Sequence, residues 1–281
     1  MQYRSFGPTD RQVSIIGMGT WYIDEGDRGT AIAALQAGLD LGMNHIDTAE
    51  MYGDAELIIG EAIRKRRDEA FLVSKVLPHN ASRQGTRKAC ERSLRRLGTD
   101  RLDCYLLHWR GPFPLEETIA GFQDLERNGK ILSWGVSNFD AGDLEEAYGI
   151  AGPAGEDIAC DQVLYHLEQR AIEHAVLPSC FRRGLAVTAY SPFGHGDFPG
   201  PETRGGQVLV EIGEAHNATP RQVALAFLTR HPAVFAIPKA SNPQHAAENA
   251  GAGDLVLSDE EIALIDHAFP RGPRPRTLPT L

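Results

Sequence analysis

The sequence has few of the residues and runs from which metal sites, disulfide frameworks and membrane spans are built. Its 281 residues include four cysteines, which are widely spaced and form no Cys-x-x-Cys pair: Cys90, Cys104, Cys160 and Cys180. This spacing excludes paired metal ligands and is typical of structural free thiols in a reducing compartment. No apolar run is long enough to cross a bilayer, and the first twelve residues hold no hydrophobic secretion segment. We therefore expect a cytoplasmic protein without a metal or a membrane partner.

Basic residues are in the minority, with 28 Lys and Arg against 38 Asp and Glu and a net charge of −10. Because a phosphate backbone is bound by clustered Lys and Arg, this balance excludes nucleic acid as a partner. The one basic cluster, residues 64–67, ends an amphipathic pattern, where cations suit the C-terminus of a helix. We interpret this cluster as a solvated helix end.

Short apolar runs alternate with helical patterns along almost the whole chain. A hairpin is predicted first, from residues 3–6 and 12–15 around a turn that contains Pro8. Eight strands are then expected at 15–19, 44–47, 71–76, 102–108, 133–137, 158–163, 186–190 and 234–237. The helical patterns lie at 28–41, 56–66, 83–97, 115–128, 141–148, 169–182 and 206–216, with further helices after Thr219, Asn242 and Ser258. Loops are expected at 149–157 and 193–205, and an irregular tail at 270–281.

Eight strands separated by helices, in a chain of this length, favour a (β/α)8 barrel over a doubly wound sheet. The dinucleotide fingerprint of the doubly wound fold is missing, because Gly17 and Gly19 are followed by Tyr22 where a third glycine would stand. No repeat or linker suggests a second domain. The sequence predicts a single α/β TIM barrel over residues 1–281, with an N-terminal β-hairpin and extra C-terminal helices.

Polar side chains stand at the end of strand after strand, where the active site of a barrel lies. Asp47 ends the second strand and precedes Tyr52, Lys75 ends the third and His108 the fourth. The later strands end in Ser137, Asn138, Gln162, Tyr190, Ser191 and Lys239. Packing alone rarely gives such a series, so we expect these residues to meet in one cleft.

The chemistry that these residues suggest is the protonation of a reacting carbonyl. Tyr52 is the candidate general acid, although a phenol has a pKa of about 10. An ammonium from Lys75 would lower that pKa, and Asp47 would keep the ammonium charged. A neutral His108 could donate a hydrogen bond to the carbonyl oxygen of a substrate. A carbonyl polarised in this way is ready for a hydride, which requires a cofactor.

The chain resembles the aldo-keto reductase family over essentially its whole length, most closely the small bacterial methylglyoxal and aldehyde reductases. The resemblance rests on motifs in the same order: Gly17-x-Gly19-Thr20-Trp21, Asp47-Thr48-Ala49-x-x-Tyr52-Gly53, Ser74-Lys75, Leu107-His108-Trp109, Gly135-Val136-Ser137-Asn138, Gln162, Tyr190-Ser191-Pro192 and Ile237-Pro238-Lys239. It implies the same catalytic tetrad of Asp47, Tyr52, Lys75 and His108. It also implies NADPH-dependent reduction of small aldehydes and ketones, such as methylglyoxal-like dicarbonyls and aldoses, to alcohols.

The resemblance further implies a cofactor site. Ser137, Asn138 and Gln162 would bind the nicotinamide amide, and Tyr190 would stack under the ring. The other expected cofactor residues are Gly19, Thr20, Trp21, Ser191, Pro192 and Phe193, with Lys239, Ala240, Ser241, His245, Glu248 and Asn249 at the adenosine end and its 2′-phosphate. The helix opened by Asn242-Pro243 agrees with this, because a helix N-terminus attracts phosphate.

Two positions depart from the family pattern. The usual Lys-Ser is Lys239-Ala240 here, and His245 stands six residues after the lysine, where an arginine is common. A histidine pairs with phosphate only when it is protonated and lacks the bidentate fork of arginine. We expect a preference for NADPH (NADP+) with weaker discrimination, so that NADH use is compatible with the sequence.

Each of these residues also has a simpler interpretation. Asp47 and Lys75 could form an ordinary ion pair, and His108 a packed core histidine, if either stood alone. His45 would join them in a metal site only with a further ligand, and barrel packing is the better explanation. Trp21 and Trp109 are expected as apolar walls of the substrate pocket.

Three functions remain in competition. The first is a reductase of small carbonyls, which the complete tetrad favours. The second is a nicotinamide-binding regulatory or redox-sensing barrel with negligible turnover. The third is a Schiff-base lyase that uses Lys75, against which the neighbouring Asp47 argues. The sequence does not fix the oligomeric state, and a monomer is compatible with it.

Overall fold

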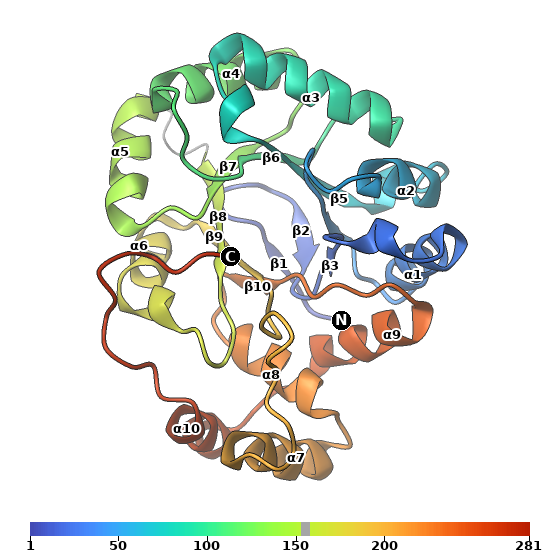
Figure 1. Cartoon of the computed structure of the whole chain (residues 1–281), viewed down its shortest axis with the longest axis vertical. Coiled ribbons are helices and arrows are strands. Elements are labelled where there is room, and N and C mark those ends of the chain that lie inside the picture. Colours follow the sequence, from blue (N-terminus) through green and yellow to red (C-terminus); the bar gives the residue numbers. More distant parts are fainter. Residues whose placement is uncertain (153–157) are drawn as a thin grey trace.

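The computed structural model describes residues 1–152 and 158–281, and its central feature is a parallel sheet surrounded by helices (Figure 1). Eight strands follow one another in spatial order: β3 (Met18–Gly19), β4 (His45–Asp47), β5 (Phe71–Val76), β6 (Cys104–Leu107), β7 (Trp134–Ser137), β8 (Ile158–Leu164), β9 (Ala186–Tyr190) and β10 (Val234–Ala236). The sheet closes on itself, since Ala236 donates its N–H to Ile15 O at 2.9 Å and accepts the N–H of Gly17 at 2.8 Å. The predicted (β/α)8 barrel is confirmed.

Helices follow the strands and cover the outside of the barrel. They are α1 (Arg28–Asp40), α2 (Ala55–Ala62), α3 (Arg83–Leu97), α4 (Leu115–Arg127), α5 (Ala141–Ala151), α6 (Val176–Arg183), α7 (Arg204–His216), α8 (Pro220–Leu228), α9 (Pro243–Gly251) and α10 (Asp259–Ala268). The capping boxes predicted at Thr219 and Ser258 are both present, at the starts of α8 and α10. The extra C-terminal helix and the irregular tail are therefore confirmed.

Three predicted boundaries are wrong. The helix expected at 169–182 is divided into the 3₁₀ turn η5 (Ala171–His174) and α6, because Pro178 fits only the first turn of an α-helix. Residues 149–151 belong to α5 rather than to a loop, while 153–157 lie outside the described residues. The helix expected at 56–66 ends at Ala62.

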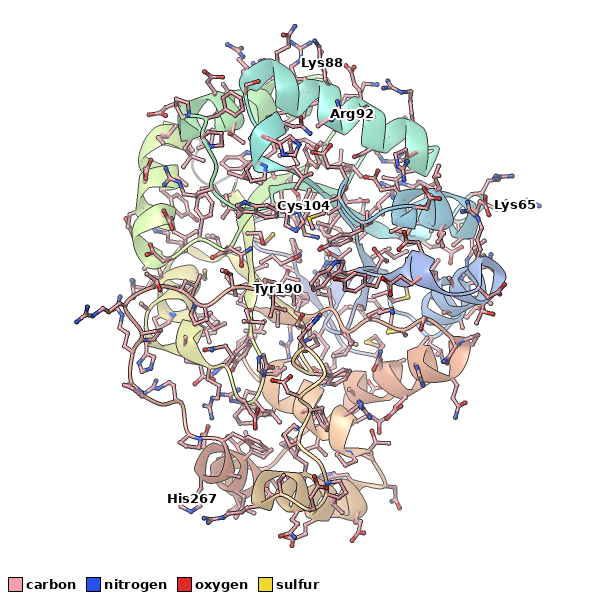
Figure 2. All side chains as sticks on the ribbon, viewed as in Figure 1. Lys65, Lys88, Arg92, Cys104, Tyr190 and His267 are labelled. Carbon is pink, nitrogen blue, oxygen red and sulfur yellow. The ribbon has the colours of Figure 1, made fainter. Side chains whose placement is uncertain are left out.

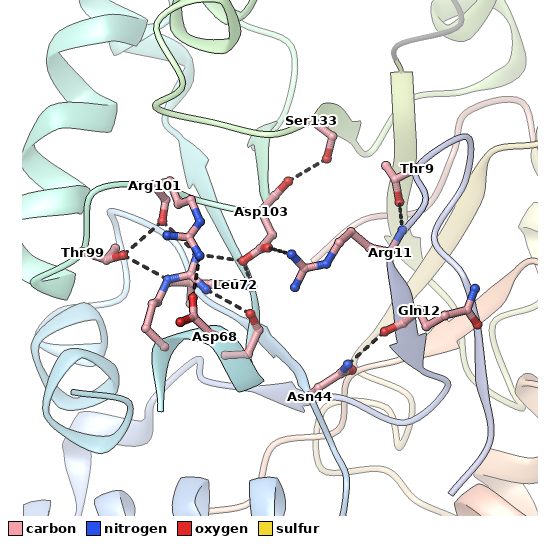
Figure 3. A network of polar contacts seen from close by, with 12 residues as sticks. Thr9, Arg11, Gln12, Asn44, Asp68, Leu72, Thr99, Arg101, Asp103 and Ser133 are labelled. Atoms are coloured by element: carbon pink, nitrogen blue, oxygen red, sulfur yellow. Dashed lines mark hydrogen bonds and ion pairs between the residues drawn. The ribbon is translucent and has the colours of Figure 1, made fainter. Parts of the chain in front are cut away.

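The basic cluster 64–67 is consequently a solvated helix end only in part, because Arg64 and Lys65 are exposed but Arg67 is not. It follows α2, and Arg67 turns toward Asp103, a carboxylate that is 1% exposed. Arg67 Nη2 lies 2.7 Å from Asp103 Oδ2, and Arg11 Nη1 approaches Oδ1 to 3.2 Å (Figure 3). A buried carboxylate needs such cations, and this need outweighs the hydration of Arg67.

The predicted hairpin closes the amino end of the barrel. Its strands β1 (Tyr3–Ser5) and β2 (Gln12–Ser14) pair antiparallel and lie behind the barrel strands in Figure 1. Phe6 points from the hairpin into the barrel, where its ring lies 5.5 Å from His45 and 4.7 Å from Phe71. His45 is fully buried among these rings, which confirms that it packs in the interior. Because this end is plugged, the carboxyl ends of the strands remain for a site.

The four cysteines are free and buried, in agreement with a structural role. Cys104 lies in the interior of the barrel (Figure 2), and burial raises the pKa of the Cys90 thiol to about 12. Within residues 1–152 and 158–281, no group of three or more His, Cys, Asp or Glu side chains could hold a metal ion. Nor is any helix in these ranges long and apolar enough to cross a membrane.

Candidate active site

Asp47 and Lys75 form an ion pair inside the carboxyl end of the barrel. They lie on the adjacent strands β4 and β5, with Lys75 Nζ 2.5 Å from Asp47 Oδ1 and 2.7 Å from Thr48 O. Burial alone would lower the pKa of Lys75, but the interactions with Asp47 and, to a smaller extent, Tyr52 raise it above its ordinary value. Burial likewise raises the pKa of Asp47, against the opposing effects of Lys75 and Gln162. The ammonium of Lys75 therefore stays charged, as predicted.

Tyr52 lies in the loop after β4, above this pair. The ammonium of Lys75 is 5.0 Å from the centroid of the Tyr52 ring. Burial raises the pKa of Tyr52 above its ordinary value, and the charge of Lys75 acts in the opposite direction. The expected effect of Lys75 is present, but the expected net lowering is wrong because the loss of water around the phenol outweighs it. Tyr52 consequently keeps its proton throughout the neutral range.

His108 follows β6 and faces Tyr52 edge to face, with 5.7 Å between the ring centroids. Its pKa falls to about 2, first because the imidazole is buried and second because Lys75 is nearby. The side chain is therefore neutral, as predicted. Asn138 donates from Nδ2 to the carbonyl oxygen of His108 at 3.2 Å and so ties the end of β6 to the end of β7.

Two adjoining cavities open above these residues. The larger has a volume of about 400 Å³, and its lining includes eleven of the predicted residues: Gly19, Thr20, Trp21, Asp47, Tyr52, Gln162, Tyr190, Ser191, Pro192, Phe193 and Lys239. The smaller, of about 130 Å³, is lined by the predicted residues Trp21, Tyr52, His108, Trp109, Ser137, Asn138, Gln162 and Tyr190. Four side chains belong to both cavities: Trp21, Tyr52, Gln162 and Tyr190. The candidate acid thus stands where the two cavities meet.

Comparison with known proteins decides what this arrangement is. The model of the Aldo/keto reductase family matches residues 15–269. The chain belongs to this family. It is 46% identical to the methylglyoxal reductase YeaE of Escherichia coli over 265 residues, which are 93% of each chain. It is 33% identical to the glyoxal reductase of Bacillus subtilis, over 89% of this chain and 87% of that one.

Solved structures agree with this assignment. An aldo-keto reductase from Klebsiella pneumoniae, crystallised in complex with NADPH, superposes with a TM-score of 0.92 at 44% identity. The match covers 100% of this chain and 99% of that chain. The chain is therefore an oxidoreductase of the aldo/keto reductase family, and the predicted resemblance is confirmed.

Some predicted residues of this aldo/keto reductase line neither cavity. Lys75 is fully buried beneath them, and the other five are Ala240, Ser241, His245, Glu248 and Asn249. Glu248 accepts a hydrogen bond from the Thr219 hydroxyl at 2.9 Å, which ties α9 to α8. His245 is exposed in the first turn of α9, and its N–H is capped by Asn242 Oδ1 at 2.9 Å. Their roles at the adenosine end of a cofactor remain predictions.

Other lining residues of this reductase were not predicted from the sequence. In the larger cavity they are Tyr22, Gly194, His195, Gly196 and Ile237, and in the smaller one Met51 and Leu281. His195 stacks on Trp21 with 5.4 Å between the ring centroids. The Gly-His-Gly run in the long loop after β9 was a usable signal, because glycines permit close approach. The sequence holds no such signal for Leu281, because its position depends on the path of the whole tail.

Proposed function

We propose that this aldo/keto reductase uses NADPH to reduce small aldehydes and dicarbonyls, such as methylglyoxal, to alcohols. The observation that carries the proposal is the meeting of Tyr52 and His108 between the two cavities, above the buried pair of Lys75 and Asp47. The methylglyoxal reductase of E. coli and the glyoxal reductase of B. subtilis, to which the chain is similar, support the substrate class. The NADPH complex of the K. pneumoniae relative supports the cofactor.

The residues of the larger cavity fit NADPH. Tyr190 offers a flat ring near the centre of the barrel mouth (Figure 2), and the ammonium of Lys239 stands at the rim. Lys239 is exposed where it lines this cavity, so its charge is available for a phosphate. Ser137 and Asn138 would hold the nicotinamide amide beside the smaller cavity. NADH use stays compatible with this site, because His245 lacks the fork of an arginine.

When bound, NADPH supplies the hydride that reduces the carbonyl carbon. His108, held neutral, donates a hydrogen bond to the carbonyl oxygen and aims it at Tyr52. Tyr52 transfers its phenolic proton to that oxygen as negative charge develops there. The ammonium of Lys75 stabilises the phenolate that remains, and Asp47 holds Lys75 in place. The charged state of Lys75 also argues against a Schiff-base lyase, which needs a neutral amine.

Turnover of methylglyoxal tests this proposal, followed as the loss of NADPH absorbance. Tyr52→Phe removes the proton donor and should lower kcat by about 100-fold or more. The Kd of NADPH, measured by fluorescence titration, should change little. Tyr3→Phe is the matched control, because Tyr3 is an exposed tyrosine that donates to Gly42 O far from the cavities.

Two outcomes would contradict the proposal in different ways. Wild-type turnover by Tyr52→Phe would remove Tyr52 from the role of acid. Tight NADPH binding without oxidation by methylglyoxal or any of a panel of small aldehydes would favour the regulatory barrel instead.

A further inference from the structure

The loop that carries Tyr52 is bracketed by two carboxylates, one partly buried and one fully buried. Glu50 precedes Tyr52, and its carboxylate accepts the N–H of Leu77 at 2.7 Å and Asn80 Nδ2 at 3.0 Å. Glu56 follows Tyr52, is 1% exposed and accepts the hydroxyl of Ser74 at 2.9 Å. Both carboxylates thus hold the loop against β5 and the segment after it, the part of the chain that carries Lys75.

One face of α3 supplies the cations that neutralise these carboxylates. Arg92 and Arg96 are four residues apart and therefore lie on the same side of the helix. Arg92 Nη2 lies 3.0 Å from Glu50 Oε2, and Arg96 Nε lies 3.1 Å from Glu56 Oε2. Figure 2 shows Arg92 on α3, outside the barrel strands. A single helix face therefore pairs with both ends of the loop.

Arg96 also holds the residues that immediately follow Tyr52. Its Nη2 donates to the carbonyl oxygen of Gly53 and lies 3.3 Å from Asp54 Oδ1. Gly53 has a φ of +46°, a conformation that other residues rarely adopt. The turn after Tyr52 is thus shaped by a left-handed glycine whose carbonyl is fixed by one guanidinium.

The loop has no regular secondary structure of its own, and the bonds on its inner side come from the barrel and from the loop itself. Residues 48–54 contain no helix or strand, and Met51, beside Tyr52, is 42% exposed. The backbone is tied by bonds from Thr48 N to Val73 O at 2.9 Å, from Glu50 N to Lys75 O at 3.3 Å and from Asp54 N to Asp24 Oδ2 at 3.0 Å. The two arginine–glutamate pairs are therefore the contacts that hold the loop from the side of α3, while these bonds hold it from the side of the barrel.

We propose that Arg92 and Arg96, paired with Glu50 and Glu56, are positioning residues that hold Tyr52 over Lys75 for proton transfer. None of the four reaches either cavity, so they act through the loop. The proposal rests on the proposed function, since it assigns a task to the loop only if Tyr52 is the acid. A misplacement of about 1 Å in a reacting group can cost about 100-fold in rate, so even a small shift of the loop is measurable.

Arg96→Met is the first test, because it keeps the length of the side chain and removes its charge and donors. With methylglyoxal and NADPH we expect kcat to fall roughly 10-fold to 100-fold, with a much smaller change in the Kd of NADPH. The solvent deuterium isotope effect on kcat should rise, because transfer of the proton from a displaced Tyr52 becomes rate-limiting. Arg95→Met is the matched control, since Arg95 is the exposed neighbour on the same helix.

Two further variants separate positioning from stability. Glu50→Gln keeps an acceptor for Leu77 and Asn80 and removes only the charge that pairs with Arg92, so it should fold and still lower kcat. In Arg96→Met with Glu56→Gln, no buried carboxylate is left unpaired, so stability should recover in part while kcat stays low.

Different results would contradict the positioning role and the proposed function. Lower melting temperatures with wild-type kcat and isotope effect, in both Arg96→Met and Glu50→Gln, would overturn the positioning role. Recovery of kcat together with stability in the double variant would do the same. Lack of turnover by the wild-type enzyme itself would instead count against the proposed function.

Discussion

At the scale of single residues, the two cavities collect unusual backbone conformations. Tyr22, Asn138 and Ser191 have φ angles of 60°, 62° and 47°, in the left-handed region that costs a non-glycine residue free energy. Tyr22 and Ser191 line the larger cavity, and Asn138 lines the smaller one. Asn138 is held by hydrogen bonds on both its backbone and its side chain. Its N–H donates to Gln162 O at 2.9 Å, its Nδ2 donates to His108 O, and its Oδ1 accepts the Tyr190 hydroxyl at 2.8 Å. The surrounding bonds stabilise a conformation that orients the amide group before any ligand arrives.

His245 provides a test of cofactor choice at the same scale. It is exposed at the start of α9, where an arginine could form a bidentate pair with a 2′-phosphate. We expect His245→Arg to lower the KM for NADPH roughly 10-fold, equivalent to about 1.4 kcal/mol, and to leave the KM for NADH nearly unchanged. Steady-state kinetics with both cofactors measures this.

Gln244→Arg is the control for this prediction, because it adds the same charge at an exposed neighbouring position. An equal gain from Gln244→Arg would mean that the effect is a general attraction of anions. An equal gain for NADH would mean that His245 does not face the 2′-phosphate.

At the scale of elements, the regular structure could be predicted where local and tertiary preferences agree. The strand at 71–76 and the helix at 83–97 have the predicted bounds, because an apolar run is buried in the first and Gly98 ends the second with a φ of 64°. The helix at 169–182 could not be predicted as one piece, since Pro178 restricts where an α-helix starts. The early end of α2 could not be predicted either, because Arg67 pairs with Asp103, which is distant in the sequence.

The residues of the candidate site also fall into those that could be predicted from the sequence and those that could not. Asp47, Lys75 and His108 could be predicted because the ends of parallel strands converge in a barrel. Tyr22, His195 and Leu281 depend on loops and on the tail, whose paths are set by contacts between residues far apart in the sequence. The net pKa of Tyr52 was beyond prediction as well, because it depends on how much water the folded chain removes from the phenol.

The tail 270–281 gives a prediction at this scale. It leaves α10, crosses the carboxyl end of the barrel and ends near its centre (Figure 1). His174 Nε2 lies 3.2 Å from Gly272 O, Leu278 packs on the core, and the N–H of Leu281 donates to the Tyr190 hydroxyl at 3.4 Å. The tail therefore forms one wall of the smaller cavity.

Deletion of residues 277–281 should open that wall. An apolar contact in a pocket is worth about 1–3 kcal/mol, so kcat/KM for methylglyoxal should fall while that for a bulky aromatic aldehyde falls less or rises. The ratio of the two kcat/KM values measures the change in selectivity. Thr280→Ala is the control, since Thr280 is exposed. An unchanged ratio in the deletion variant would show that the tail does not shape the substrate site.

At the scale of the whole molecule, the two ends of the barrel differ: one is a packed core and the other holds the candidate active site. The amino end is closed by the hairpin and by rings around His45, whereas the carboxyl end holds the cavities. Burial lowers the pKa of His45 to about 3, with a smaller effect from Lys75. His45 thus lies in an apolar cage formed by Phe6, Phe71 and Phe235.

This cage makes the stability of the barrel depend on pH. Below pH 6.5 the unfolded chain binds a proton at His45, while the folded chain binds none until the pH approaches about 3. Stability from this group is therefore fully present above pH 6.5 and falls, as the pH decreases toward 3, by about 1.4 kcal/mol per pH unit. His108, with a folded pKa of about 2, adds a dependence of the same sign.

His45→Leu should reduce this dependence, because leucine fills the cage and binds no proton. Urea unfolding at pH 7, 6 and 5 measures it: we expect the loss of unfolding free energy between pH 6 and 5 to shrink by about 1.4 kcal/mol in the variant. His267→Leu is the control and should keep the wild-type slope, since His267 lies on the outer face of α10 and is exposed to water (Figure 2). The slope that remains in His45→Leu belongs in part to His108 and should survive, because that imidazole is buried and its folded pKa is about 2. If the unfolding free energy of His45→Leu depends on pH as steeply as that of the wild type, His45 binds its proton in the folded chain as readily as in the unfolded one. That result would contradict the apolar cage.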